Sequence, residues 1–387
     1  VVGVSPRLNL VGVGRLAHPP ALRLAFSEER RVMNIRRVAA IAAASTLALG
    51  LAACGGGSGG SGGSGNAGDR PNQMYTWVSN QSDREQWETF IAGVHEQGDK
   101  DFKITLDGPS FQEYWTLVKT RMAASDAPCI ITTQAARAQE LGSLLAPLDD
   151  LAKEAGLDLG QYNEAMMQGL TVDGTVRAIP YDAEPMLLFY NKALFQAAGL
   201  EMPGADYSRD QFISDAKALT KDGKYGFAVS ADIGYPPLAL SFANGLLPTK
   251  DGELTLTDSE LVKDIQWTMD LVSKEQIAAA PAPGDTDEIG RQAFMAGNVA
   301  MFIDGPWFYS TDQEGSDFEV GIAAPPSTSG QAGGMIQGSG FGIADSCPDK
   351  AAAFANIVKM TTPEVVAYVG QHRGTVSSIA SALEGWS

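Results

Sequence analysis

From about residue 73 onward, short apolar runs alternate with amphipathic segments along the chain. Residues 73–79 alternate apolar and polar side chains, which predicts a first β-strand. A polar turn follows, and residues 84–96 then repeat apolar side chains at helical spacing, which predicts an amphipathic helix. The same patterns predict a strand, a helix and a short buried strand, at residues 102–106, 111–124 and 129–133. This order of elements is typical of an open α/β sheet.

Ligands of open α/β sheets bind beyond the carboxyl ends of the strands. In this chain those ends fall at Ser79 and Asn80 and at residues 133–137. We therefore expect a binding site there, with Asn80 as a candidate contact.

The residues before this region predict an export signal. A short basic segment that begins at Met33 leads into the apolar run 38–51, which has about 14 residues against the roughly 20 of a membrane-spanning helix. Small residues then precede Cys54, which resembles the lipobox of bacterial lipoproteins, where the cysteine is lipidated and becomes the N-terminus. The alternative is a plain secretory leader cleaved near Ala53. Residues 1–32 are interpreted as a non-native or unstructured extension.

A flexible tether is expected between this signal, residues 33–53, and the α/β region. Residues 55–65 contain only Gly and Ser, so residues 54–69 are interpreted as the lipidated cysteine with its tether. The glycines are not expected to form a nucleotide site, because no strand precedes them and no Lys-Ser/Thr pair follows.

The charge of the chain argues against some partners. Its net charge is −18, and because residues 1–53 contain seven Arg and two Glu, the remainder has a net charge of about −23. Such acidity disfavours nucleic acid and anionic lipid as direct partners. With three His in the chain, no metal-ligand spacing and no cofactor motif, we expect no cofactor. Cys129 and Cys347 are compatible with an exported protein that has one optional disulfide.

The most informative block is DGTVRAIPYDAEPMLLFYNKALF at residues 173–195, followed by AGL. It resembles the strand, crossover, strand and helix of the extracellular solute-binding proteins that serve ABC importers, in the carbohydrate-binding family that includes maltose-binding protein. Further stretches resemble the family in the same order, at residues 203–220, 224–227, 294–301, 304–307, 338–344 and 349–354. The resemblance covers about residues 74–379.

Some positions depart from the family pattern. Arg209 stands where the family often has Trp, and Cys129 where it usually has Asp. The family also commonly continues for tens of residues beyond the position of Ala382. We therefore expect either a compact member or a sequence shortened at this end.

The resemblance implies an α/β, two-lobed, periplasmic-binding-protein-like fold of type II. Each lobe is then expected to be an open, mostly parallel sheet flanked by helices, with the ligand cleft between the lobes and hinge closure upon binding. Crossings between the lobes are expected near residues 181–184, 324–326 and 375. The expected N-lobe is residues 70–182 plus 325–375, and the expected C-lobe is residues 183–324 plus 376–387. Cys129 and Cys347 would share a sheet edge away from the cleft if their strands are antiparallel neighbours.

A sugar needs aromatic rings against its C–H faces and fixed acceptors for its hydroxyls. Trp307, which follows a Gly-Pro corner, is our first candidate for the stacking platform, and a core tryptophan is the alternative. Glu184 matches a family position whose carboxylate accepts sugar hydroxyls, and a hinge salt bridge is the alternative. Arg137 matches a ligand-binding arginine of the family, and a solvated charge at a helix start is the alternative.

Weaker candidates come from loose alignment and from the positions of strand ends. Tyr235 falls near an aromatic contact of the family, and Asp182, Asn80 and Ser339 are expected at the edge of the cleft. Trp77 could be a core or a cleft residue. The other tryptophans at helical spacing are interpreted as core or left unassigned, namely Trp87, Trp115 and Trp267.

The resemblance implies a lipid-anchored substrate-binding protein on the outer face of the bacterial cytoplasmic membrane. It would bind a sugar or oligosaccharide as a monomer and deliver it to the membrane subunits of an ABC importer, without catalysis. The alternatives are a surface-anchored glycan hydrolase, a sensor lipoprotein, or a binder of a non-sugar solute with the same fold. Asp182 and Glu184 are a poor pair for a glycosidase, because one strand-like segment contains both.

Overall fold

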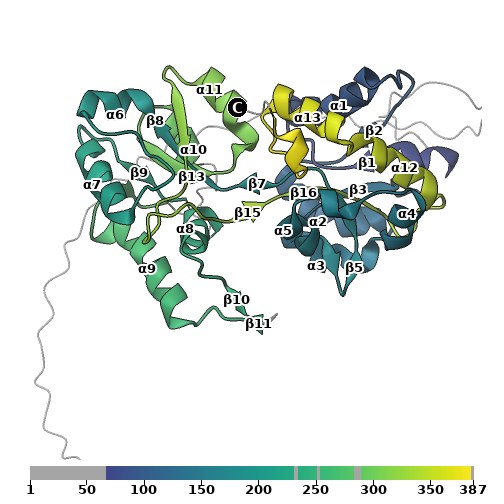
Figure 1. Ribbon diagram of the computed structural model, residues 1–387, viewed down its shortest axis with the longest axis horizontal. Coiled ribbons are helices and arrows are strands. Elements are labelled where there is room, and N and C mark those ends of the chain that lie inside the picture. The colour runs from purple at the N-terminus through teal and green to yellow at the C-terminus, as the bar shows by residue number, and fades with distance from the viewer. Residues whose placement is uncertain (1–66, 231–233, 251–252, 283–288, 385–387) are drawn as a thin grey trace, which may run out of the picture. The chain divides into compact units, whose positions relative to one another are not determined.

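The computed structural model describes residues 67–230, 234–250, 253–282 and 289–384 (Figure 1). The predicted signal peptide, Cys54 and most of the Gly/Ser tether lie outside the described residues. The described residues belong to one compact unit that comprises residues 63–387.

A five-stranded sheet forms the centre of the first lobe, with the strand order β2-β1-β3-β16-β6. The strand β1 pairs in parallel with β2 and β3, whereas β16 is antiparallel to both β3 and β6. The bounds are β1 (Gln73–Tyr75), β2 (Thr105–Asp107), β3 (Ile130–Gln134), β6 (Ala178–Pro180) and β16 (Ser339–Ile343). The predicted strands are thus present, but β1 ends four residues earlier than the alternation indicated.

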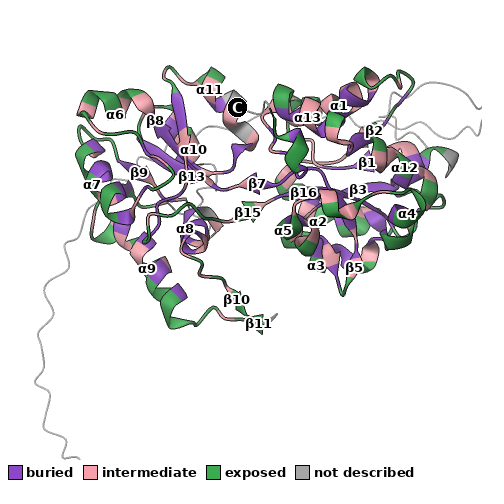
Figure 2. Ribbon diagram, in the orientation of Figure 1, coloured by how far each residue is buried: buried purple, intermediate pink, exposed green. Residues whose placement is uncertain are grey.

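Helices cover this sheet, and their apolar faces form its core. The helix α1 (Gln81–Glu96) begins after Asn80, whose side chain accepts the Asp83 N–H at 3.0 Å. Trp87 and Phe90 of α1 are 1% exposed and pack among the rings of Tyr181 and Phe341. Trp87 is therefore a core residue, as expected. Figure 2 shows that these helices expose their outer faces while the strands are largely buried.

The other elements of the first lobe are shorter or follow β16. The helices are η1 (Ala67–Asn72), α2 (Phe111–Met122), η2 (Ala135–Arg137), α3 (Ala138–Leu141), η3 (Gly142–Leu144), α4 (Asp149–Glu154), η4 (Leu159–Gln161), α5 (Glu164–Gly169), α12 (Lys350–Met360), α13 (Pro363–Arg373) and η7 (Ala380–Ala382). The strands β4 (Thr171–Val172) and β5 (Thr175–Val176) form a small hairpin.

The second lobe has its own sheet and its own core. Its central strand β8 (Leu187–Asn191) lies between β13 (Met301–Asp304) and β14 (Val320–Ala323). The helices are α6 (Lys192–Ala198), α7 (Arg209–Leu219), η5 (Gly234–Leu238), α8 (Ala239–Ala243), α9 (Ser259–Ser273), α10 (Ile289–Met295), η6 (Pro306–Phe308) and α11 (Tyr309–Gly315). The remaining strand pairs are β9 (Phe227–Ala228) with β12 (Ala278–Ala279), and β10 (Thr249–Lys250) with β11 (Glu253–Leu254).

The expectation of a mostly parallel sheet is met in neither lobe. The sheet of the first lobe has two parallel and two antiparallel pairs. In the second lobe, both neighbours of β8 are antiparallel to it, and the parallel pair β9 with β12 lies outside this sheet. A parallel pair requires a crossover connection that returns the chain to the same end of the sheet. In the first lobe, β1, β2 and β3 have such connections through α1 and α2, whereas β16 enters the sheet from the crossing segment and so runs opposite to β3.

The lobes are connected by paired segments. The strand β7 (Glu184–Pro185) is antiparallel to β15 (Ile336–Gln337), and Ala183 N donates to Val376 O at 2.9 Å. Three segments therefore lie together at the crossing, at residues 182–185, 336–339 and 375–378.

Two expected lobe boundaries are corrected by these contacts. Ser327 exchanges backbone hydrogen bonds with Arg209 and Tyr207, so the chain remains with the second lobe beyond residues 324–326 and crosses near residue 336. Ile379 and Ala382 belong to the first lobe's core, which contradicts the assignment of residues 376–382 to the C-lobe. Both segments contain buried side chains. Their packing partners lie in the lobe to which these contacts assign them, and not in the lobe that was expected.

Cys129 and Cys347 form a disulfide whose Cα atoms are 5.0 Å apart. Cys129 precedes β3 and Cys347 follows β16, and these strands are antiparallel neighbours. The two cysteines therefore lie at one end of the sheet, while the chain crosses to the second lobe at the other end.

Candidate functional site

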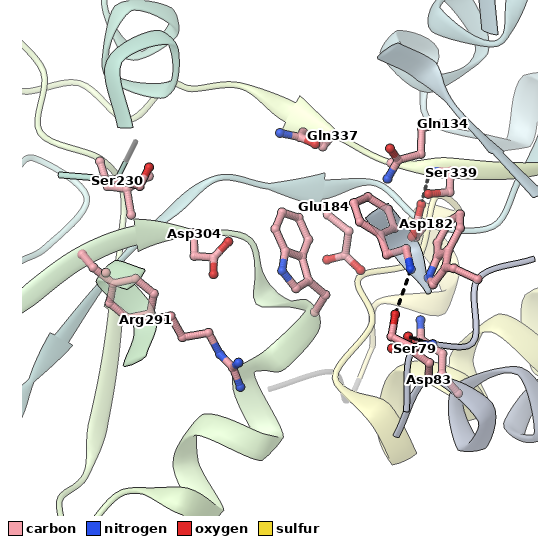
Figure 3. A pocket seen from close by; sticks show the side chains of 18 of the residues that line it. Ser79, Asp83, Gln134, Asp182, Glu184, Ser230, Arg291, Asp304, Gln337 and Ser339 are labelled. Atoms are coloured by element: carbon pink, nitrogen blue, oxygen red, sulfur yellow. Dashed lines mark hydrogen bonds between the residues drawn. The ribbon is translucent and has the colours of Figure 1, made fainter. Parts of the chain in front are cut away.

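A pocket of about 210 Å³ is lined by residues of both lobes and of the crossing segments (Figure 3). This volume is below the roughly 300–1,000 Å³ of sites for drug-sized ligands. The enclosed part of the pocket therefore suits a small ligand or one unit of a longer one.

Trp77 forms an aromatic wall on the first lobe. It follows β1, and its ring makes edge-to-face contacts with Trp87 and Phe111, with centroids 5.2 Å apart in each pair. Trp87 Nε1 also donates to the Trp77 carbonyl at 2.7 Å, which fixes the backbone at this position. Trp77 and Phe111 both line the pocket, so the packing holds an aromatic surface against the space where a ligand would bind.

Trp307 forms the corresponding wall on the second lobe. It follows β13 in the short helix η6, where Pro306 occupies the first position. A Cβ atom added at Gly305 would lie 1.9 Å from the Trp307 ring. The ring therefore packs directly against the glycine backbone, and any larger residue at position 305 would displace it. Trp307 is partly buried, packs against the second lobe's core and lines the pocket.

Two carboxyl groups lie at the base of the pocket on the crossing segment. Asp182 is 6% exposed and accepts the Ser339 N–H, whereas Glu184 is 3% exposed and accepts the Val376 N–H through Oε1 at 3.1 Å. Among the described residues, Glu184 Oε2 has no hydrogen-bond partner. A buried acceptor without a donor is costly, so this oxygen is suited to a donor from a ligand.

Burial changes the titration of this pair. Burial raises the pKa of Asp182 to about 8, although the Ser339 N–H opposes the change. Burial, together with the neighbouring carboxylate of Asp182, raises the pKa of Glu184 well above its usual range. The two groups therefore resist being charged at the same time while the pocket is empty.

Polar side chains from both lobes complete the lining. Asp83 Oδ2 accepts the Ser79 N–H at 2.8 Å, which orders the turn before α1. On the second lobe, Asp304 accepts the Gly305 N–H at 2.8 Å at the end of β13. The further polar residues of the lining are Asn80, Gln86, Gln134, Ser230, Arg291, Gln337 and Ser339.

The structure brings most of the predicted site residues together. Five of the seven candidate ligand contacts line this pocket, namely Asn80, Asp182, Glu184, Trp307 and Ser339. Arg137 is not in the lining; its guanidinium lies 5.1 Å from the centroid of the Trp115 ring and 3.4 Å from Glu140, with 45% of the side chain exposed. Tyr235 belongs to η5, but its side chain lies outside the described residues.

Several lining residues were not proposed from the sequence. Gln134 falls within the strand-end stretch 133–137 and could have been chosen instead of Arg137. Asp83 and Asp304 lie in segments that the sequence analysis singled out, but an acidic side chain in a turn gives no signal of its direction. Phe111 begins a helix, and helical spacing alone does not distinguish a lining residue from a core residue.

Neither a metal site nor a membrane span is found within the described ranges. No group of His, Cys, Asp and Glu side chains there is placed to hold a metal ion. Likewise, none of the helices in those ranges combines the length and apolar character needed to cross a bilayer.

Comparison with known families gives one clear match. The profile of the family described as bacterial extracellular solute-binding protein matches residues 78–367. The diacetylchitobiose binding protein DasA of Streptomyces coelicolor is 26% identical over 293 residues, which are 71% of this chain and 64% of the relative. The maltodextrin-binding protein MdxE of Bacillus subtilis is 24% identical over 285 residues, which are 69% and 62%. The matched region thus spans just under two thirds of the length of each relative.

Solved structures with the same fold are also similar. UgpB from Mycobacterium tuberculosis, in complex with glycerophosphocholine, has a TM-score of 0.71 and 21% identity, and the match covers 82% of this chain and 84% of that chain. Lmo0181 from Listeria monocytogenes, in complex with cycloalternan, has a TM-score of 0.67 and 21% identity, with 81% and 82% covered. These similarities confirm the two-lobed, periplasmic-binding-protein-like α/β fold.

Proposed function

Because the chain belongs to the family of bacterial extracellular solute-binding proteins, we propose that it captures a sugar or oligosaccharide and delivers it to an ABC importer. The observation that most supports this proposal is the pocket itself. Aromatic rings from both lobes line it, together with Glu184, whose Oε2 has no hydrogen-bond partner in the part of the chain that the structure describes.

The two kinds of group suit the two chemical surfaces of a sugar. The apolar C–H face of a pyranose stacks on an aromatic ring, and Trp307 and Trp77 offer such rings. The hydroxyl groups need fixed acceptors and donors, which Glu184, Asp182 and the Ser339 side chain offer at the crossing. DasA and MdxE are named for diacetylchitobiose and maltodextrin, which supports a carbohydrate as the ligand.

Closure of the lobes on the ligand is the second part of the proposal. The pocket includes residues of both lobes, and the connections are the short segments at residues 182–185, 336–339 and 375–378. A ligand in contact with both walls would favour a closed arrangement, which the importer would then recognise. We further propose that the protein is a monomer anchored through lipidated Cys54 to the outer face of the membrane.

Catalysis is not part of this proposal. A glycosidase places two carboxyl groups about 5–9 Å apart on opposite sides of the scissile bond. Asp182 and Glu184 come from one segment, and both hydrogen-bond to backbone N–H groups of the crossing. Incubation with the bound sugar should therefore release no product, and steady release of a shorter sugar would favour the hydrolase alternative.

Thermal melting against a panel of mono- and oligosaccharides tests the proposal. A ligand at one hundred times its dissociation constant stabilises the folded protein by about 2.7 kcal/mol, which corresponds to a rise of several degrees in the midpoint. Trp307→Ala should abolish this rise, whereas Tyr225→Ala, which removes a ring 37% exposed and outside the pocket lining, should preserve it. If no sugar changes the midpoint of the wild type, carbohydrate is not the ligand.

A further inference from the structure

The pocket wall has an excess of acidic side chains. Among the residues that the structure describes, four carboxyl groups line it, at Asp83, Asp182, Glu184 and Asp304, against one basic residue, Arg291. They come from separate elements of the fold, since Asp83 lies on α1, Asp304 ends β13, and the other two lie on the crossing segment. Figure 3 labels Asp304 and Glu184 among the side chains that line the pocket. A ligand in this pocket is therefore surrounded by carboxyl groups from both lobes.

The charge of Arg291 is partly offset by a residue outside the pocket lining. Its guanidinium lies 2.6 Å from Oδ1 of Asp312, a carboxyl group that is 1% exposed. Asp312 is not among the lining residues, and a buried ion pair of this kind holds the guanidinium in place. Part of the charge of Arg291 is therefore offset by a carboxylate that lies outside the pocket lining.

One oxygen of this acidic wall requires a donor. Glu184 is 3% exposed and lines the pocket, and its Oε2 has no hydrogen-bond partner among the described residues. A neutral hydroxyl could donate to this oxygen, but it would do little to offset the cost of ionising Glu184 beside Asp182, whose burial raises both pKa values. A positively charged N–H group would donate and also favour the ionised carboxylate, because charge-assisted hydrogen bonds are the stronger kind.

The aromatic walls favour the same kind of ligand. Trp77 and Trp307 line the pocket together with Tyr181, Phe302 and Phe111. The face of an aromatic ring attracts a cation, most strongly when the ring is that of Trp and the site excludes water. Acidic and aromatic side chains in one pocket are thus complementary to a ligand that has both hydroxyl groups and a positive charge.

We propose that the ligand is a polyhydroxylated molecule with a positively charged nitrogen, such as an amino sugar, whose ammonium group binds between Asp304 and Glu184. The proposal rests on the proposed function and narrows its substrate class. The hydroxyl groups of such a ligand bind as described above, and its nitrogen lies within reach of the rings of Trp77 or Trp307. A neutral sugar of the same size binds the same pocket more weakly.

Calorimetric titration with two matched pairs of sugars tests the proposal. The pairs are glucosamine against glucose, in which one ammonium group replaces a hydroxyl, and chitobiose against cellobiose, in which two do. Both are measured at about pH 7 in low salt, where most of the amine is protonated. With the full chain, we expect the amine of at least one pair to bind at least tenfold more tightly than its neutral partner.

Variants on both lobes show whether the carboxyl groups cause this preference. Asp304→Asn keeps an acceptor for the Gly305 N–H and should reduce the preference to about threefold or less. Asp83→Asn, on the other lobe, should reduce the preference for the amine to a smaller extent. This variant provides the test if Asp304→Asn does not fold. Glu88→Gln removes an exposed charge from α1 outside the pocket lining, and the preference should remain unchanged.

The outcomes separate this inference from the proposed function. If neutral sugars bind as tightly as their amines, or if Asp304→Asn and Asp83→Asn both leave the preference intact, the inference is overturned while sugar binding stands. If no sugar of either kind binds, the proposed function fails, and the inference fails with it.

Discussion

The second lobe and the crossing segment each bury two charged side chains, but they arrange them in opposite ways. In the second lobe, Arg209 binds both carboxylate oxygens of Asp264, at 2.7 and 3.0 Å, and its guanidinium lies 3.8 Å from the centroid of the Trp267 ring. At the crossing, Asp182 and Glu184 are both acidic, and their main hydrogen bonds come from backbone N–H groups.

The difference separates charges that stabilise the fold from charges that are available to a ligand. In the Arg209 and Asp264 pair the two opposite charges bind each other directly, although Arg209 Nε has no hydrogen-bond partner among the described residues. Arg209 stands where the family often has Trp, so a paired ion replaces an apolar side chain. The pair at the crossing is left with raised pKa values, and within the described part of the chain Glu184 Oε2 has no hydrogen-bond partner. Such groups lower the stability of the empty protein, and a ligand can relieve that cost. Changes in the first cluster should therefore affect stability, and changes in the second should affect binding.

The largest expected effect is from Asp264→Ala. Removal of this carboxylate leaves the Arg209 guanidinium buried without its counter-ion, which typically costs about 3–5 kcal/mol in the free energy of unfolding. Urea denaturation measures this loss. The control is Glu260→Ala on the same helix, where an exposed carboxylate pairs with Lys263 and the expected cost is below about 1 kcal/mol. Equal effects of the two variants would contradict a structural role for the buried pair.

A somewhat smaller loss is expected from Cys347→Ser. The disulfide to Cys129 joins residues that are 218 positions apart, and the loss of such a native cross-link typically costs about 2–5 kcal/mol. Because the cysteines lie away from the crossing, the dissociation constant for the sugar should change less than threefold. Denaturation and calorimetry on the same preparation measure the two effects, and a large loss of affinity would show that this end of the sheet influences the pocket.

Asp182→Asn should stabilise the protein near neutral pH. The carboxyl of Asp182 titrates near about 3.9 when the chain is unfolded and at about 8 in the folded protein. Between these values the unfolded chain has released a proton that the folded chain still holds, so stability falls as the pH rises from about 4 to 8. Asn retains an acceptor for the Ser339 N–H but does not titrate. We expect a gain of at least about 1 kcal/mol at pH 7.5, and little gain near pH 4.

Denaturation at several pH values tests this sign. Glu88→Gln serves as the control, because it removes an exposed carboxylate from α1, and its effect should be nearly independent of pH. A loss of stability in Asp182→Asn at every pH would show that the charged carboxylate stabilises the crossing.

The sequence predicted the order of elements in the first lobe because each has a clear local signal. Alternation marked β1, and helical spacing marked α1. The antiparallel sheet of the second lobe and the late crossing near residue 336 have no such signal. Strand direction and lobe assignment depend on contacts between residues that are distant in the chain.

The site was predicted where the family resemblance or a strand end fixed a position. Trp307 and Glu184 line the pocket as the resemblance implied, and Asn80 does so because it follows β1. Arg137 lies three residues beyond Gln134, and the chain turns into η2 between them, which directs the arginine toward Trp115. The excess of carboxyl groups in the pocket could not be seen, because overall acidity does not show which charges gather in one place.

The most direct test of the central claim is the affinity of Glu184→Gln for the sugar that most stabilises the wild type. The account predicts that calorimetry gives a dissociation constant at least tenfold weaker, because the amide cannot match a carboxylate as an acceptor at the base of the pocket. It also predicts that the free energy of unfolding of the empty variant is equal to or higher than that of the wild type. Unchanged affinity in a folded Glu184→Gln would contradict the claim that the ligand binds at this carboxyl pair.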